Sequence, residues 1–127
     1  MRSQKVRFTS RFVVVVIAIC GIANLASPVA WAHAVLLSAQ PGENSTVSGP
    51  DVAVLLKYNS RVDTQHSTLT LLAPDGKVEK VAIGGQPAPE LLSAKLTGLV
   101  KGAYELRWQV LAIDGHVTRG KVIFQIR

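Results

Sequence analysis

Three side chains in this sequence have the types and spacing to hold one metal ion: His33, Asp114 and His116. Asp114 and His116 are two positions apart, so in an extended segment they project to the same side. Gly115 between them gives the backbone room to bring both side chains onto one ion. The pair therefore offers a carboxylate oxygen and an imidazole nitrogen, both of which are common metal ligands.

His33 becomes a stronger ligand if it is the first residue of the mature chain. It then offers two nitrogens, the free α-amine and the ring Nδ1, which can chelate one ion together. The amine must lose its proton to bind, and its ordinary pKa of roughly 7.7–8.0 allows this near neutral pH when a strong Lewis acid competes. Cu(II) is the strongest such competitor among the divalent first-row metals, and it favours tetragonal sites of nitrogen and oxygen. A third nitrogen from His116 and an oxygen from Asp114 would complete a typical Cu(II) site.

Residues 1–32 have the three parts of a secretory signal peptide. Basic residues precede an apolar run from Phe12 to Ala26, and Ala30-Trp31-Ala32 supplies the Ala-x-Ala cleavage site. The apolar run is about 15 residues long, shorter than the roughly 20 that span a bilayer as a helix. We therefore expect cleavage between Ala32 and His33, and an exported domain formed by residues 33–127. An uncleaved membrane anchor is the alternative.

Removal of this signal peptide changes the composition of the chain. Of the 14 basic residues, four lie in the signal peptide, so residues 33–127 keep ten against 8 acidic residues, a formal net charge of +2. No basic tract remains, and we expect no nucleic-acid partner. The single cysteine, Cys20, and the single methionine, Met1, are also removed. Without thiolate or thioether ligands, a bound transition metal must use nitrogen and oxygen, which leaves Cu(II) and Zn(II) open and excludes a methionine Cu(I) site.

The Asp114-Gly115-His116 tripeptide lies between two runs in which apolar and polar residues alternate. This alternation is typical of strands with one buried face. The apolar positions are Tyr104, Leu106, Trp108 and Val110 before the tripeptide and Val122, Phe124 and Ile126 after it. The sequence therefore predicts a β-hairpin that carries the acid and the imidazole at its turn. Asp-Gly is also a common hairpin turn in its own right, so the pattern alone leaves a purely structural role open.

The rest of the mature chain shows short runs with strand character, separated by turns at intervals of about 8–12 residues, as is typical of an all-β sandwich. We expect about seven short strands, with Trp108 in the core. The expected extended segments before the hairpin are 33–38, 52–58, 66–72, 78–83 and 90–96, of which 52–58 should be covered on both faces and 90–96 is extended or a brief helical turn. The expected turns and loops include 39–45, 59–65 and 84–89.

A long motif of fixed spacing runs through the final hairpin, and a shorter one opens the mature chain. The long motif comprises Gly102, Tyr104, Trp108, Val110, Asp114-Gly115-His116, Gly120 and Phe124, and the short one comprises His33-Ala34, Ser38 and Pro41. By these motifs residues 33–127 resemble the CopC family of periplasmic copper-resistance proteins. The resemblance implies a small Greek-key, immunoglobulin-like β-sandwich that binds one Cu(II) ion through His33, Asp114 and His116.

The resemblance also implies a role in copper homeostasis and resistance. Family members act as periplasmic copper carriers or buffers beside a membrane copper transporter of the CopD type. We therefore expect a monomeric Cu(II)-binding protein that is not an enzyme. Ser60 stands where many members have an acidic residue near the copper, which leaves a further ligand at this position open. His66 is expected to be a surface histidine outside the site.

Two other functions fit parts of the sequence. An N-terminal histidine with a second histidine also resembles the copper site of polysaccharide monooxygenases, which are oxidative enzymes built on a similar sandwich. Those enzymes generally present a flat aromatic surface, whereas residues 33–127 contain few aromatic side chains. A metal-free structural sandwich is the other alternative, and it predicts that His33 and His116 are unrelated in space.

Overall fold

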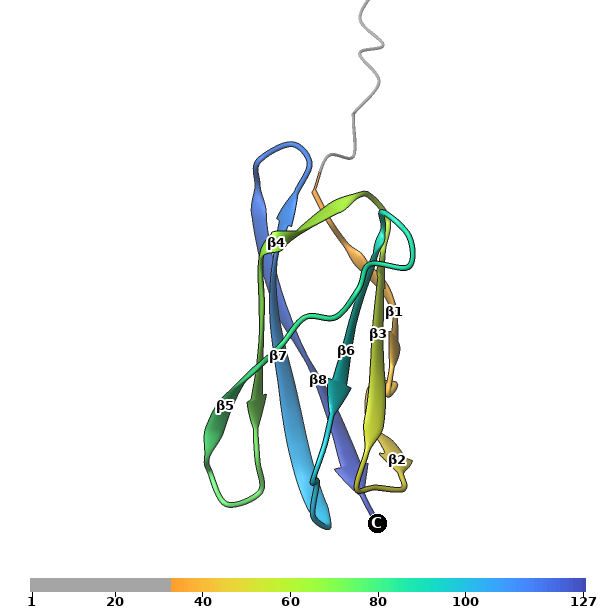
Figure 1. Ribbon diagram of the computed structural model, residues 1–127, viewed down its shortest axis with the longest axis vertical. Coiled ribbons are helices and arrows are strands. Elements are labelled where there is room, and N and C mark those ends of the chain that lie inside the picture. Colours follow the sequence, from red (N-terminus) through yellow and green to blue (C-terminus); the bar gives the residue numbers. More distant parts are fainter. Residues whose placement is uncertain (1–32) are drawn as a thin grey trace, which may run out of the picture. The chain divides into compact units, whose positions relative to one another are not determined.

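Eight strands form a two-sheet β-sandwich in the computed structural model, which describes residues 33–127 (Figure 1). The strands are β1 (Leu36–Gln40), β2 (Ser45–Val47), β3 (Val52–Tyr58), β4 (Val62–Leu72), β5 (Val78–Val81), β6 (Leu91–Leu96), β7 (Gly102–Ala112) and β8 (Val117–Ile126). One sheet has the order β1-β3-β6 and the other the order β2-β8-β7-β4-β5. The prediction of an all-β sandwich is confirmed, with eight strands rather than about seven.

The core lies between the two sheets and is built from alternate residues of the long strands. Every second residue of β7 from Tyr104 to Ala112 is buried. Trp108 is 8% exposed, as expected of a core residue, and packs edge-on against Tyr58 of the opposite sheet, with ring centroids 5.4 Å apart. Such edge-to-face pairs add roughly 0.5–1.5 kcal/mol to the gain from burial, so this contact helps to join the sheets.

The final hairpin is formed as predicted. β7 and β8 pair without a register shift from Gly102 opposite Ile126 to Leu111 opposite Val117. The connection between them contains Asp114 and Gly115, and Gly115 has a φ of 84°, a left-handed conformation that glycine adopts without strain. The hairpin thus holds its turn at the end of the sandwich where the first described residues also lie (Figure 1).

The expectation that the segment 52–58 is covered on both faces is wrong. In β3 the side chains of Val52, Val54, Leu56 and Tyr58 are buried, whereas Ala53 and Lys57 are exposed. β3 is the middle strand of the three-stranded sheet, and that sheet is packed on its inner face alone. The apolar residues Ala53 and Leu55 on the outer face obscured the alternation in the sequence.

Two predicted connections are also partly strand. The expected turn at 39–45 overlaps the end of β1 and the start of β2, and β2 pairs in parallel with β8. The expected polar connection at 59–65 overlaps the start of β4, which begins at Val62. Both segments are polar, so hydrophobic alternation gave no signal for them. The hairpin of β4 and β5 and the exposed loop at 84–89 are as predicted.

The predicted signal peptide, residues 1–32, lies outside the residues that the structure describes. Within residues 33–127, no helix is long and apolar enough to cross a membrane.

Gly120 should be required by the core. It lies opposite Trp108 in the β7–β8 ladder, and a Cβ at this position would overlap the indole ring at Cζ2. Gly120→Ala should therefore lower the free energy of unfolding of residues 33–127 by about 1–3 kcal/mol, because the ring or the strand must move. Urea denaturation measures the change. Gly85→Ala is the matched control, since a Cβ there meets nothing within 4 Å; equal midpoints for the two variants would contradict the packing argument.

Candidate metal centre

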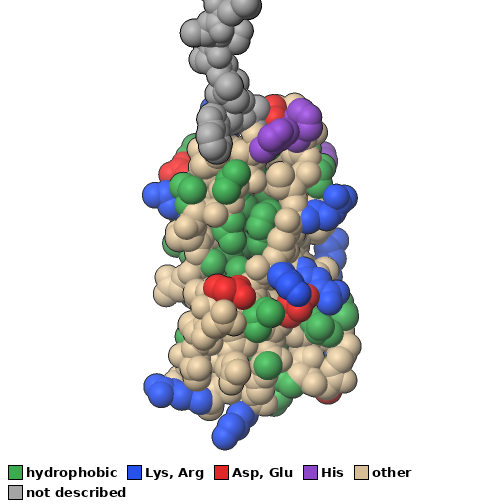
Figure 2. Space-filling model, turned by 180° about the vertical axis from the view of Figure 1, so that it is seen from behind, with side chains coloured by type: hydrophobic (Ala, Val, Ile, Leu, Met, Phe, Trp, Pro, Cys, Tyr) green, Lys and Arg blue, Asp and Glu red, His purple; other side chains and the backbone are tan. Residues whose placement is uncertain are grey.

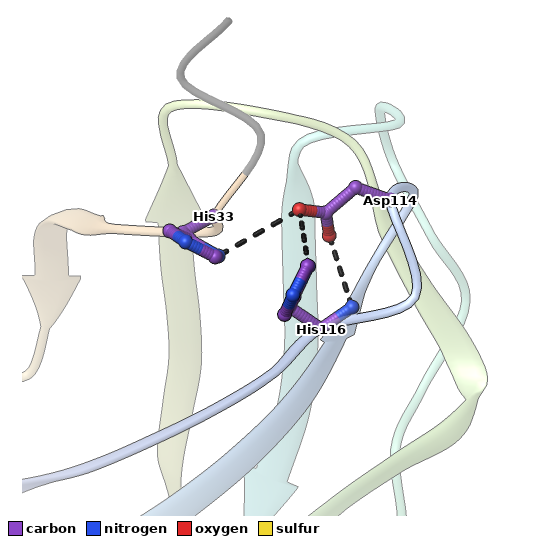
Figure 3. A group of neighbouring side chains, drawn as sticks. All are labelled: His33, Asp114 and His116. Carbon is purple, nitrogen blue, oxygen red and sulfur yellow. Dashed lines mark hydrogen bonds and ion pairs between the residues drawn. The ribbon is translucent and has the colours of Figure 1, made fainter.

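The structure brings His33, at the start of the described chain, together with Asp114 and His116 of a turn near its end (Figure 3). His33 comes just before β1, and the other two side chains come from the turn between β7 and β8. Asp114 Oδ2 lies 3.6 Å from His33 Nδ1 and 2.7 Å from His116 Nδ1. The centroids of the two imidazole rings are 4.6 Å apart. The wide separation that a metal-free module predicted is therefore not found.

The spacing of the three side chains suits a single ion. Each offers one ligand atom, and these atoms all lie within 4.8 Å of one another. Bonds of about 2.0 Å to nitrogen and oxygen allow two ligands of one ion to be at most about 4 Å apart. Side-chain rotations that move the ligand atoms by less than about 1 Å would therefore let all three contact one ion.

The β7–β8 turn fixes the carboxylate of Asp114. The backbone N–H of His116 donates to Asp114 Oδ1 at 3.0 Å, and the N–H of Gly115 donates to the carbonyl of Ala112 at 2.9 Å. The hydrogen bond from the His116 N–H, aided by the His116 ring, holds the pKa of Asp114 below its ordinary value. The carboxylate is thus ionised near neutral pH and ready to bind a cation.

The segment that carries His33 is held by both sheets. Ala34 is 2% exposed, and its carbonyl accepts a hydrogen bond from Thr118 Oγ1 at 2.9 Å. The backbone N–H of Val35 donates to Asn59 Oδ1 at 2.7 Å, and the N–H of Asn59 donates back to the carbonyl of Val35 at 3.0 Å. Thr118 belongs to β8 of the five-stranded sheet, while Asn59 directly follows β3 of the other. These contacts place His33 beside the turn.

The three side chains differ in exposure. The side chain of His33 is 63% exposed and that of His116 is 65% exposed, whereas Asp114 is 16% exposed. Histidine side chains accordingly lie on the surface at one end of the domain (Figure 2). The centre therefore has a fixed, sheltered carboxylate and two imidazoles that face solvent.

Two further residues singled out in the sequence lie outside this group. Ser60 Oγ is buried and has no hydrogen-bond partner among the described residues, and Ser60 is not one of the grouped ligands. His66 is on the surface, as expected, with a 68% exposed side chain that pairs with Asp63. Neither Thr118 nor Asn59, which hold the segment that carries His33, was predicted from the sequence. Thr118 could have been noticed, because it lies two positions after His116, and residues two apart in an extended segment project to the same side.

Comparison with known proteins identifies similar chains. A family model described as the CopC domain matches residues 36–127. Protein YobA of Escherichia coli K12 is 28% identical over 107 residues, which cover 82% of this chain and 86% of that protein. Copper resistance protein C of Xanthomonas campestris pv. juglandis is 30% identical over 113 residues, covering 83% of this chain and 88% of the relative. The crystal structure of CopC from Methylosinus trichosporium OB3b superposes with a TM-score of 0.68 at 28% identity, covering 74% of this chain and 93% of that one.

Thr118 should position His33 without touching the metal. Thr118→Val keeps the size and branching of the side chain but removes the hydrogen bond to the Ala34 carbonyl. We expect the affinity of the centre for a copper ion to fall by about tenfold, as is usual when a group that orients a ligand is lost. Competition with a chelator of known affinity measures the change. Thr118→Ser should restore most of the affinity, whereas equal weakening by Val and Ser would contradict a role for the hydroxyl.

Proposed function

The chain belongs to the CopC family, and we propose that it is an exported copper protein that binds one Cu(II) ion at His33, Asp114 and His116. The observation that carries this proposal is the meeting of the three side chains at one exposed point, although 80 or so residues separate His33 from the turn. The relative from Xanthomonas campestris is named a copper resistance protein, which supports copper as the metal.

The donor set favours Cu(II) over other metals. If the chain is cut after Ala32, His33 contributes its α-amine and its ring, His116 contributes another nitrogen, and Asp114 contributes an oxygen. Divalent copper binds such nitrogen and oxygen sites more strongly than the neighbouring divalent metals do. Residues 33–127 contain neither cysteine nor methionine, so the soft ligands that Cu(I) prefers are missing from this part of the sequence.

The proposed role is that of a carrier or buffer in the periplasm, working as a monomer beside a membrane copper transporter of the CopD type. The Ala-x-Ala site before His33 supports export, because the same cut creates both the mature protein and the amine ligand. The exposure of both imidazole rings supports a carrier, since a partner could reach the ion without unfolding the domain.

An oxidative enzyme is less well supported than a carrier. Polysaccharide-oxidising copper enzymes generally present a flat surface of aromatic side chains that stack against sugar rings. Tyr58, Tyr104, Trp108 and Phe124 are the tyrosine, tryptophan and phenylalanine residues of the described chain, and all four are buried. We therefore propose that copper is the cargo of this protein and not its catalytic cofactor.

The α-amine can be tested directly. A chain that keeps Ala32 before His33 has an amide where the mature chain has an amine, and an amide nitrogen does not bind in the same way. We expect Cu(II) binding to weaken by more than about tenfold, that is by more than about 1.4 kcal/mol. Competitive titration and the visible absorption band of bound Cu(II) measure the effect against the chain that begins at His33. Equal affinity of the two forms would refute ligation by the amine.

His116 can be tested independently of the terminus. His116→Ala removes one ligand from an exposed turn that contributes little to the core, so copper affinity should fall by about tenfold or more while the urea midpoint stays unchanged. The matched control is His66→Ala, which removes an exposed imidazole outside the centre and should leave the affinity for the first copper ion unchanged. If His116→Ala unfolded the domain, the histidine would have a structural role instead.

A further inference from the structure

A second aspartate and histidine pair, Asp63 and His66, repeats the geometry of the turn between β7 and β8. Asp63 Oδ2 lies 2.7 Å from His66 Nδ1, and Asp63 Oδ1 accepts the backbone N–H of His66 at 3.3 Å. Asp114 and His116 make the same two contacts, at 2.7 Å and 3.0 Å. In both pairs one carboxylate oxygen is held by the backbone, and the other faces the imidazole of the same loop.

The Asp63–His66 pair is built into a β-bulge. Between Asp63 and Thr68, β4 advances five residues while its partner β7 advances two, from Leu111 to Gln109, so β4 contains three extra residues here. Bulges often redirect side chains next to functional sites. Hydrogen bonds of Ser67 stabilise this bulge: its Oγ donates to the carbonyl of Asp63 and accepts the N–H of Leu111 at 3.2 Å. The N–H of Gln65 also donates to Asp63 Oδ1, at 2.9 Å.

The separation of the two polar atoms matches adjacent ligands of one metal ion. Two bonds of about 2.0 Å that meet at a right angle place their ligand atoms about 2.8 Å apart. His66 Nδ1 and Asp63 Oδ2 lie at nearly this distance, with side chains that are 68% and 41% exposed. The hydrogen bond from the His66 ring also holds the pKa of Asp63 below its ordinary value, so the carboxylate is ionised at neutral pH.

The pair lies at the same end of the sandwich as the first centre. A hollow of about 390 Å³ is lined by Asp63 on one side and by Ala112, Ile113 and Gly115 on the other. Figure 1 shows the start of β4 and the β7–β8 turn together at this end. Arg61 also lines the hollow, and its positive charge disfavours a cation near Asp63. A metal site here should therefore be weaker than the first one.

We propose that Asp63 and His66 form a second, weaker Cu(II) site, with His66 Nδ1 and Asp63 Oδ2 as adjacent ligands and water in the other positions. The choice of copper as the metal rests on the proposed function. The argument that the pair can bind a metal ion rests on its own geometry and is independent of that function. A weak site beside a strong one gives an incoming ion a place to bind before the first centre takes it up. The site also gives His66 a function apart from the first centre.

The experiment follows the three imidazole rings of the chain that begins at His33, using NMR during titration with Cu(II), which broadens the resonances of nearby nuclei. The rings of His33 and His116 should broaden during the first equivalent and that of His66 during the second. Asp63→Asn keeps the size of the side chain and an oxygen for the backbone N–H groups. It should weaken the second binding event by about tenfold. His116→Ala should impair the first event and leave broadening of His66 intact.

Two outcomes would overturn the second site. If the His66 resonances stay sharp through the second equivalent, the pair does not bind copper. If they broaden equally in Asp63→Asn, His66 binds copper only as an isolated surface histidine. Failure of the proposed function looks different, because His33 and His116 would then stay sharp while His66 broadens, and this result would support the second site.

Discussion

The position of His33 depends on one constraint, the attachment of Ala34 and Val35 to both sheets. A chain terminus is normally poorly ordered, and fixing one residue of backbone costs roughly 1–2 kcal/mol in conformational entropy. The hydrogen bond that Thr118 donates to Ala34 and the pair of hydrogen bonds between Val35 and Asn59, together with the burial of Ala34, offset this cost before any ion arrives. His33 therefore lies beside the β7–β8 turn as part of the fold, and a metal ion would find the three side chains already close together.

The carboxylate and the imidazoles of the centre are fixed to different degrees. Asp114 is sheltered and held by the backbone of its own turn, whereas both rings are largely exposed. At Asp63 and His66 the backbone of a bulge likewise holds the aspartate beside an exposed imidazole, although the Asp63 side chain is itself 41% exposed. The β7–β8 turn and the β4 bulge thus share one local arrangement, although their backbones differ. In both, the backbone orients an aspartate and the aspartate orients a histidine.

Sequence patterns predicted the strands in which buried and exposed residues alternate strongly. They did not predict the strands formed by polar residues. The β7–β8 hairpin and its turn followed from alternation and from Asp-Gly, because each long strand has one face in the core. β2 and the start of β4 are polar, and their pairing is set by tertiary contacts that leave no periodic signal. The grouping of His33 with the turn was expected from ligand chemistry and from a family resemblance. The contacts that produce it, through Asn59 and Thr118, depend on a junction between sheets that no local pattern encodes.

The openness of the centre determines how an ion held there would leave. With both rings largely exposed, a donor group of another molecule could approach such an ion while His33 and His116 were still bonded to it. Ligand substitution can then proceed stepwise, with one new bond made before an old one breaks, and no free hydrated ion has to form. A centre with the same donors inside the core would release its ion only as often as the domain opened locally. For an ion held at this centre, the ligand atoms would therefore set the affinity, whereas the exposure of the rings would set how long the ion stays bound.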